Sequence, residues 1–359
     1  MTTMLDGITG GIVDTPRGGF HVIRAHANPS GPYDPADIPV VFIHGNVSSS
    51  LFYQPTMLGL GRDSLATDLR GFGDSETLPV DATRGVRDFS DDVAAVLDSL
   101  GIARAHLVGW SMGGGVVQQL LLDRPDLVAT LTLISPVSPH GFGGTRLDGS
   151  PLSVDAAGTG GGGANPEFVA SLAAQDTSAD TPTTARSVFR TTYVAPGYSS
   201  DLEDLWVESM LSTALGDDNY PGTTAASASW PGFAAGTRGV LNTMAPTYFN
   251  TAGIVESAHK PPVLWVHGEL DAIVGDETFF DLNTLGKHGI IPGWPGDEVA
   301  PPQPMVAQTR AVLDAYRANG GDCTELALPG VGHSAHLERP EQFREALLAH
   351  IDGGEQGQS

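Results

Sequence analysis

The chain has 359 residues, of which 42 are acidic and 18 are basic, so its formal net charge is -24 at neutral pH. This charge argues against nucleic acids and anionic membrane surfaces as partners, because both would repel the protein. Hydrophobic residues make up 40% of the chain, which is enough for a full core and excludes global disorder. The length suits one large α/β domain with an insertion, or two ordinary domains.

Neither secretion nor membrane insertion is expected. Residues 1–11 lack the basic segment and the long apolar run of a signal peptide. No stretch approaches the roughly eighteen apolar residues that are needed to span a bilayer. The single cysteine, Cys323, leaves no intramolecular disulfide to form. We therefore expect a cytoplasmic protein, and no feature of the sequence indicates its oligomeric state.

Apolar runs alternate with helical periodicities in two parts of the chain. The runs predict strands at 20–25, 40–43, 64–68, 102–108, 128–134, 262–268 and 323–328. The periodicities predict helices at 86–100, 113–124, 305–318 and 340–351. A loop rich in Pro, Gly and Asp is expected at 28–39. Strands that alternate with helices predict the α/β class, with a mostly parallel, doubly wound sheet.

The alternation stops between Ser135 and Lys260. This stretch has no clear strand, and helical patterns are found only near 166–174, 200–215 and 237–249. We interpret it as an inserted, mainly helical cap over the carboxyl edge of the sheet. The predicted domains are a core, 1–134 and 261–359, and a cap, 135–260. Some apolar side chains of the cap should line a substrate pocket.

One glycine-rich turn connects a predicted strand to a predicted helix. Gly109-Trp110-Ser111-Met112-Gly113 has the Gly-x-Ser-x-Gly pattern of a nucleophile elbow. The small residues on both sides allow a sharp turn that exposes the serine hydroxyl above the start of the helix. Unpaired N–H groups at a helix start favour negative charge. The pattern is short enough to occur by chance, so its partners elsewhere in the chain decide its meaning.

A serine hydroxyl needs an adjacent base, which a third group must orient. Residues of these types follow three predicted strands in the order Ser111, Asp271 and His333. Active residues of an open parallel sheet gather at the carboxyl ends of its strands, so the three should meet. The turn His44-Gly45-Asn46-Val47 follows another strand and can direct backbone N–H groups at the same centre.

The sequence resembles the α/β-hydrolase superfamily, in its serine-nucleophile members with a helical cap. The resemblance covers roughly 39–134 and 260–351, and it implies the α/β-hydrolase fold with an inserted cap. It also implies Ser111 as nucleophile, His333 as general base and then acid, and Asp271 as the residue that orients His333. The oxyanion hole of the family consists of two backbone N–H groups, which fall here on Asn46 and Met112. The motifs that carry the resemblance are His44-Gly45, Asp68-x-Arg70-Gly71-x-Gly73-x-Ser75, Gly109-Trp110-Ser111-Met112-Gly113, Gly268-x-x-Asp271 and Gly332-His333-x-x-His336-Leu337-Glu338-x-Pro340.

Other residues compete for these roles. His336 lies one turn beyond His333, where a structural or pocket-lining role is expected. Glu269 and Asp276 are near Asp271 but lack its spacing in the motif. His44 is expected to bond to backbone near the oxyanion hole. Asp68, Asp74, His267 and Glu338 are also interpreted as structural, whereas the side chain of Asn46 could face the substrate.

The serine limits the chemistry. Relatives that cleave carbon–halogen bonds or epoxides use an aspartate at the elbow, so Ser111 argues against both reactions. A serine forms an acyl-enzyme, which predicts a carboxylic ester or lactone of a small, fairly apolar molecule as substrate. A C–C bond hydrolase and a perhydrolase or haloperoxidase of the same fold remain alternatives, as does a non-catalytic ligand-binding protein. No metal-ligand spacing and no dinucleotide or phosphate motif is present, so we expect no cofactor and no metal.

Overall fold

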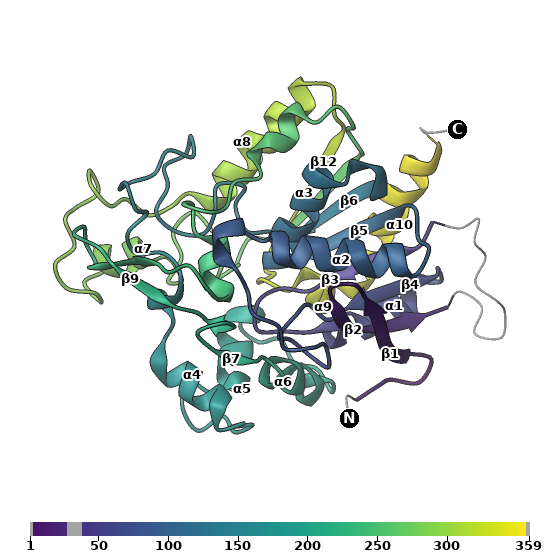
Figure 1. The fold of residues 1–359 in the computed structure, drawn as a ribbon, viewed down its shortest axis with the longest axis horizontal. Coiled ribbons are helices and arrows are strands. Elements are labelled where there is room, and N and C mark those ends of the chain that lie inside the picture. Colours follow the sequence, from purple (N-terminus) through teal and green to yellow (C-terminus); the bar gives the residue numbers. More distant parts are fainter. Residues whose placement is uncertain (1–2, 27–37, 357–359) are drawn as a thin grey trace.

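The computed structural model describes residues 3–26 and 38–356. Its centre is an eight-stranded sheet with the strand order β1-β2-β4-β3-β5-β6-β11-β12 (Figure 1). Strands β1 and β2 are antiparallel at one edge, and the six others pair in parallel, which confirms the predicted sheet. The strands are β1 (Thr9–Thr15), β2 (Gly18–Ala25), β3 (Val40–Ile43), β4 (Ser64–Thr67), β5 (Ala105–Trp110), β6 (Val128–Ile134), β11 (Val263–Gly268) and β12 (Cys323–Leu328).

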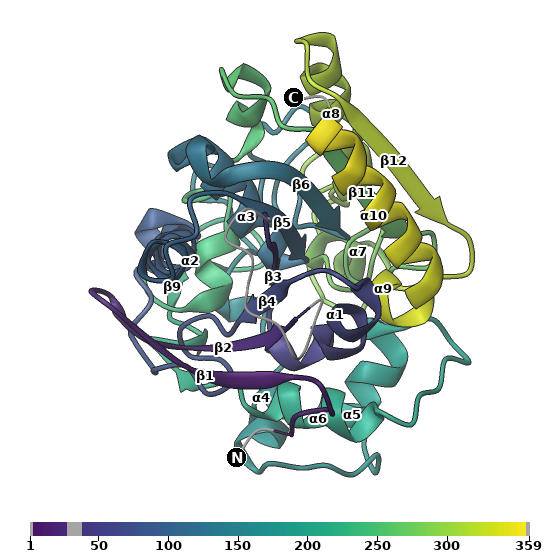
Figure 2. The same cartoon turned by 90° about the vertical axis from the view of Figure 1, so that its right-hand side faces the viewer.

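Helices cover both faces of the sheet, with α2 on one side and α10 on the other (Figure 2). On one face, α2 packs against α3, and α3 contacts β3, β5 and β6. On the other face, α10 contacts α1, β6 and β11. Every residue of β3, β5, β6 and β11 is consequently buried, as expected of strands that are covered twice. These helices are α1 (Gln54–Leu60), α2 (Arg87–Ser99), α3 (Met112–Asp123), α8 (Met305–Ala318), α9 (Ala335–Glu338) and α10 (Pro340–Gln356).

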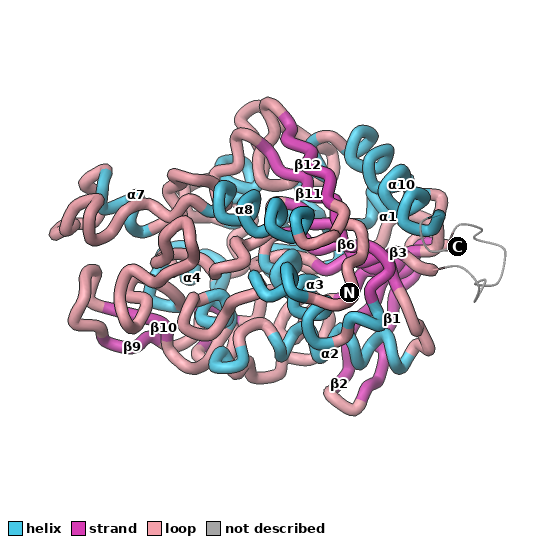
Figure 3. Tube along the Cα trace, turned by 90° about the horizontal axis from the view of Figure 1, so that it is seen from above, coloured by secondary structure: helices cyan, strands magenta, loops and turns pink. Residues whose placement is uncertain are grey.

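The segment between β6 and β11 adds no strand to this sheet. Loops dominate it (Figure 3), and its short helices are α4 (Pro166–Ala173), α5 (Ala185–Val188) and α6 (Glu203–Leu211). It also holds two small ribbons, made by β7 (Leu215–Gly216) with β8 (Tyr220–Pro221) and by β9 (Thr224–Ala226) with β10 (Phe233–Ala235). The expectation that this segment has no strand is therefore wrong in detail. The division into core and cap domains stays a prediction.

Two further expectations differ from the structure. The helix expected at 237–249 is only a 3-10 turn, Val240–Met244. Gly239 precedes it with φ +91°, and Ala245 is extended because Pro246 follows, so the helix cannot continue on either side. A helix that was not expected, α7 (Leu282–Lys287), follows β11. The loop expected at 28–39 lies mostly outside the described residues.

Candidate active site

Ser111 occupies a strained turn between β5 and α3. Its φ of +55° and ψ of -120° lie outside the regions that side-chain-bearing residues prefer. Close packing around the turn maintains this conformation. A Cβ atom on Gly113 would lie 2.2 Å from the carbonyl oxygen of Ile43, and one on Gly45 would lie 2.9 Å from the Cβ of Ser111. Only glycine fits at these two positions, which explains the glycines around the serine.

His333 and Asp271 form a hydrogen-bonded pair. The Nδ1 atom of His333 lies 2.8 Å from Oδ2 and 3.0 Å from Oδ1 of Asp271, and each side chain is only 2% exposed. The backbone N–H groups of Ile273 and Val274 donate to Oδ1 at 2.8 and 2.9 Å. The carboxylate is thus fixed from two sides. An Nδ1–H that donates to it leaves the other ring nitrogen, Nε2, as the base.

Ser111 and His333 line the same cavity, together with Asn46. The indole N–H of Trp110, the residue before Ser111, donates to the carbonyl oxygen of His333 at 3.0 Å. This bond connects the elbow directly to the histidine loop. The structure therefore brings the three predicted catalytic side chains to one place, although their roles remain predictions.

One predicted oxyanion-hole residue, Met112, follows Ser111 in the elbow, and the other, Asn46, lies in the turn after β3. Met112 is the first residue of α3, so its N–H has no acceptor within the helix. The turn that carries Asn46 is held by His44, whose Nδ1 lies 2.7 Å from the Gly45 carbonyl oxygen. The Nε2 atom of His44 accepts the N–H of Leu69 at 3.0 Å. His44 therefore has the structural role that the sequence predicted.

The competing residues are used elsewhere. His336 is buried against Tyr53 and Trp110, and its burial lowers its pKa to about 3, so it stays neutral at pH 7. Glu269 is exposed, and Asp276 accepts the N–H of Ala307 at the start of α8. None of the three contacts the His333 ring through a hydrogen bond among the described residues.

Asp68 also has a structural role. It is fully buried and accepts the N–H groups of Ser50 and Asp74 at 2.7 and 3.0 Å. It also pairs with His21 at 2.8 Å. Although burial by itself opposes the charge, these bonds hold the pKa of its carboxyl below the usual value.

The inserted segment contacts both the turn that carries Asn46, here called the oxyanion turn, and the loop that carries His333, here called the histidine loop. The Tyr193 hydroxyl donates to the carbonyl oxygens of Asn46 and Val47 at 3.0 and 3.1 Å. Two residues later, the Ala195 N–H donates to Oε2 of Glu338, while Oε1 of the same carboxylate accepts the N–H of Gly332. Gly332 directly precedes His333. The sequence indicated that Glu338 is structural but not what it joins, because its two partners lie far apart in the chain.

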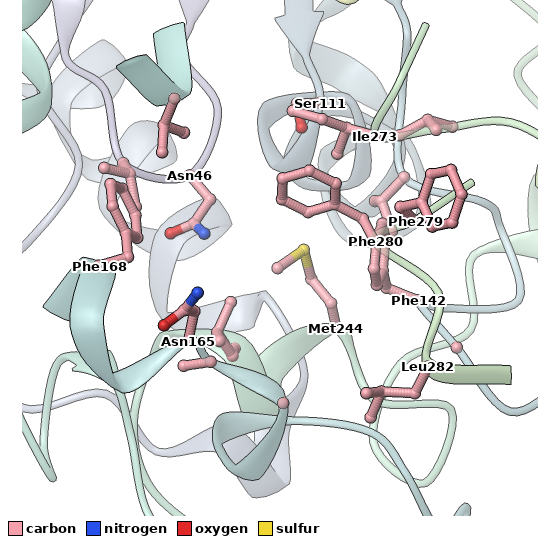
Figure 4. Close-up of a pocket in the computed structure, with 18 of the residues that line it drawn as sticks. Asn46, Ser111, Phe142, Asn165, Phe168, Met244, Ile273, Phe279, Phe280 and Leu282 are labelled. Carbon is pink, nitrogen blue, oxygen red and sulfur yellow. The ribbon is translucent and has the colours of Figure 1, made fainter. Parts of the chain in front are cut away.

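A cavity of about 520 Å³ opens beside Ser111 (Figure 4). Its wall is mostly aromatic and aliphatic, and none of its lining residues is Asp, Glu, Lys or Arg. One part of the wall comes from the inserted segment, as the sequence predicted. Another part comes from the chain after β11, which the sequence did not mark as functional because it lacks a motif or a periodicity. The residues of that second part are Ile273, Val274, Phe279, Phe280, Leu282, Leu285 and Ile290.

The described residues offer no site for a metal ion and no helix that could cross a membrane. Within 3–26 and 38–356, no group of three or more His, Cys, Asp or Glu side chains is arranged to hold a metal ion. None of the helices in the same part of the chain combines the length and the apolar character that crossing a membrane requires.

Comparison with known proteins identifies the family. A family model for the alpha/beta hydrolase fold matches residues 38–279, so the chain belongs to this family, as the sequence motifs predicted. It is 31% identical to carboxylesterase YbfK of Bacillus subtilis over 115 residues, which are 32% of this chain and 38% of YbfK. It is 34% identical to epoxide hydrolase B of Mycobacterium tuberculosis over 132 residues, or 36% of this chain and 37% of that protein.

The likeness of fold extends over nearly the whole chain. A solved esterase from Exiguobacterium antarcticum superposes with a TM-score of 0.58 at 16% identity, covering 96% of this chain and 100% of that one. At this identity the likeness concerns the fold alone. The chain spans less than half of the length of the curated relatives that it matches. Their activities therefore bear on this chain only as hypotheses.

Proposed function

We propose that the chain is a serine hydrolase that cleaves a carboxylic ester or lactone of a small, neutral and fairly apolar substrate. The observation that carries this proposal is the Asp271–His333 pair beside the strained Ser111 elbow, with the serine and the histidine lining one uncharged cavity. A serine next to an oriented histidine suits acyl transfer. The sequence similarity to carboxylesterase YbfK supports the same reaction class.

The reaction proceeds in two halves. Nε2 of His333 takes the hydroxyl proton while the Ser111 Oγ attacks the carbonyl carbon of the substrate. The N–H groups of Asn46 and Met112 stabilise the oxyanion, and each such donor contributes about 2.7–4 kcal/mol to lowering the barrier. His333 then returns the proton to the leaving alcohol. In the second half, His333 takes a proton from the water that attacks the acyl carbon, and it passes this proton to the Ser111 Oγ as the C–O bond breaks and the acid leaves.

The cavity wall supports an apolar acyl group. Phenylalanine, leucine and isoleucine side chains can bury it, and each CH₂ group that leaves water contributes about 0.8 kcal/mol. An ionised substrate group would be desolvated without a partner of opposite charge, because the lining has no Asp, Glu, Lys or Arg. The sequence similarity to epoxide hydrolase B suggests epoxide hydrolysis as another reaction. That reaction needs a carboxylate at the elbow, where this chain has Ser111.

A panel of p-nitrophenyl esters with acyl chains of increasing length tests the proposal. We expect Ser111-dependent hydrolysis that improves from acetate towards medium chains, and at least a 1000-fold loss of kcat in Ser111→Ala. Ser99→Ala is the matched control, because Ser99 is exposed at the end of α2 and does not line the cavity. Equal activity of Ser111→Ala and the wild type would refute a serine mechanism. Diketone cleavage or peroxide-dependent bromination that exceeds ester hydrolysis would favour the other reactions of the fold.

A further inference from the structure

Two carboxamide side chains stand in the mostly apolar wall of the cavity. Asn46 comes from the turn after β3, and Asn165 directly precedes α4 in the inserted segment. Figure 4 shows their amide groups pointing toward one another on one side of the cavity, with Phe279 and Leu282 on the other side. The two residues are 119 positions apart in sequence, so only the fold brings them to one cavity.

The two amide groups differ in how the protein holds them. The Oδ1 atom of Asn165 caps α4 by accepting the N–H of Glu167 at 2.9 Å, which leaves its NH₂ group as a donor toward the cavity. The Oδ1 atom of Asn46 is buried and has no hydrogen-bond partner among the described residues. A buried carboxamide oxygen without a partner is unfavourable, and such an atom in a binding cavity calls for an explanation. A bound ligand with a hydrogen-bond donor would give this oxygen its missing partner.

We propose that Asn46 and Asn165 form a polar subsite for a second, neutral hydrogen-bonding group on the acyl part of the substrate. This inference rests on the proposed ester or lactone hydrolysis and specifies its substrate class. The two NH₂ groups can donate to a carbonyl oxygen, such as that of a ketone or a secondary amide. The Oδ1 atom of Asn46 can accept the N–H of the amide. A carboxylate or an ammonium group does not fit, because no charged side chain lines the cavity to pair with it.

The position of Asn46 places this subsite close to the reacting bond. Its backbone N–H belongs to the predicted oxyanion hole, while its side chain faces the cavity (Figure 4). A substrate whose ester carbonyl occupies the hole therefore presents the next few atoms of its acyl chain to the carboxamides. The phenylalanines of the opposite wall are left for the apolar remainder of the chain.

Matched substrates test the subsite. The wild type is assayed with p-nitrophenyl octanoate and with p-nitrophenyl oxo-octanoates that carry one ketone at C4, C5, C6 or C7. A neutral hydrogen bond in the subsite should raise kcat/KM about 3- to 10-fold for at least one ketone position over octanoate. A wild type without preference for any ketone position overturns the proposal, and this result requires no variant.

Two variants test whether the preference for ketone-bearing esters depends on Asn46 and Asn165. Asn165→Ser keeps a helix-capping oxygen but loses the NH₂ group, and Asn46→Leu keeps the backbone N–H but loses the carboxamide. Both should bring the ratio of ketone to octanoate activity close to one. Asn250→Ser is the control, because Asn250 is exposed, does not line the cavity and likewise accepts a backbone N–H, that of Ala252. A ratio that both subsite variants leave unchanged would also overturn the proposal.

The outcome separates this inference from the reaction itself. If octanoate hydrolysis depends on Ser111 but ketones confer no advantage, the subsite is wrong and the proposed reaction stands. If neither octanoate nor any oxo-octanoate is hydrolysed, or if Ser111→Ala hydrolyses them equally well, the proposed reaction fails first.

Discussion

The carboxylate of Asp271 is held by two backbone N–H groups and by the ring of His333. It accepts two backbone N–H groups and faces Nδ1 of His333, and it is almost fully buried. These contacts orient the ring so that Nδ1 carries the proton. In the proposed reaction, Asp271 acts only through His333 and stabilises its imidazolium form.

Asp271→Asn should keep the shape of the site but lower kcat by about 10³- to 10⁴-fold, because an amide can hold the wrong tautomer of His333. The measurement is kcat for p-nitrophenyl octanoate, with thermal unfolding as a check on folding. Glu269→Gln removes an exposed carboxylate two residues away and should change kcat less than twofold. Similar rates in Asp271→Asn and the wild type would exclude the residue from the mechanism.

At the scale of elements, residues Tyr193 to Ala195 join two loops of the site. The tyrosine holds the oxyanion turn, and the alanine N–H meets Glu338, which also holds the residue before His333. One short piece of the inserted segment thus bonds both to the turn that carries Asn46 and, through Glu338, to the loop that carries His333.

Glu338→Gln should lower the free energy of unfolding by about 1–3 kcal/mol, because one buried N–H would face an NH₂ group instead of an oxygen. We also expect kcat to fall while KM changes little, since the histidine loop loses its position and the cavity wall keeps its residues. Chemical denaturation and steady-state kinetics measure the two effects. Glu341→Gln, an exposed residue of the next helix, is the control. Unchanged stability and kcat in Glu338→Gln would contradict this role.

The chain after β11 adds two phenylalanines, Phe279 and Phe280, to the wall of the cavity. Phe280 lines the cavity and is still 43% exposed, so its ring lies at the solvent-facing edge of the cavity. Phe280→Ala should lower kcat/KM for the octanoate about tenfold while the acetate loses little, because only the longer chain reaches this ring. The ratio of the two kcat/KM values measures the effect. Equal losses for both esters would show that Phe280 does not contact the acyl chain.

Sequence patterns predicted the buried elements well and the cavity wall poorly. Helix α8 and strand β6 lie at the predicted positions, because the helix has a periodic buried face and every residue of the strand is buried. Strand β1 was missed, since it is mostly exposed and contains adjacent glycines. Ser111, Asp271 and His333 stand in recognisable motifs. Phe280 and the partners of Glu338 depend on long-range contacts, which no local pattern encodes.

At the scale of the whole molecule, buried histidines make the fold sensitive to acid. Burial lowers the pKa of His106 to about 4 and that of His336 to about 3. In the unfolded chain both titrate near 6.5. As pH falls below 6.5, the unfolded state binds protons more readily than the folded state, so His106 contributes a loss of stability down to about pH 4 and His336 down to about pH 3. Above pH 6.5 they contribute no pH dependence.

His336→Phe isolates this effect, because His336 has no hydrogen-bond partner among the described residues and packs against aromatic rings. The variant should gain stability relative to the wild type by about 2 kcal/mol more at pH 5 than at pH 8. Urea unfolding at the two pH values gives this difference. The exposed His288 provides the control, since His288→Gln should show no such difference. A difference of zero in His336→Phe would contradict a buried, neutral His336.

The central claim is that Ser111 forms an acyl-enzyme. The most direct measurement mixes the enzyme with p-nitrophenyl octanoate, quenches the reaction in acid within milliseconds, and locates the octanoyl group by peptide mass spectrometry. We predict an octanoyl group on the peptide that carries Ser111, formed with a burst of p-nitrophenol and absent in Ser111→Ala. Wild-type turnover without any acyl group on Ser111, together with undiminished turnover in Ser111→Ala, would contradict the claim.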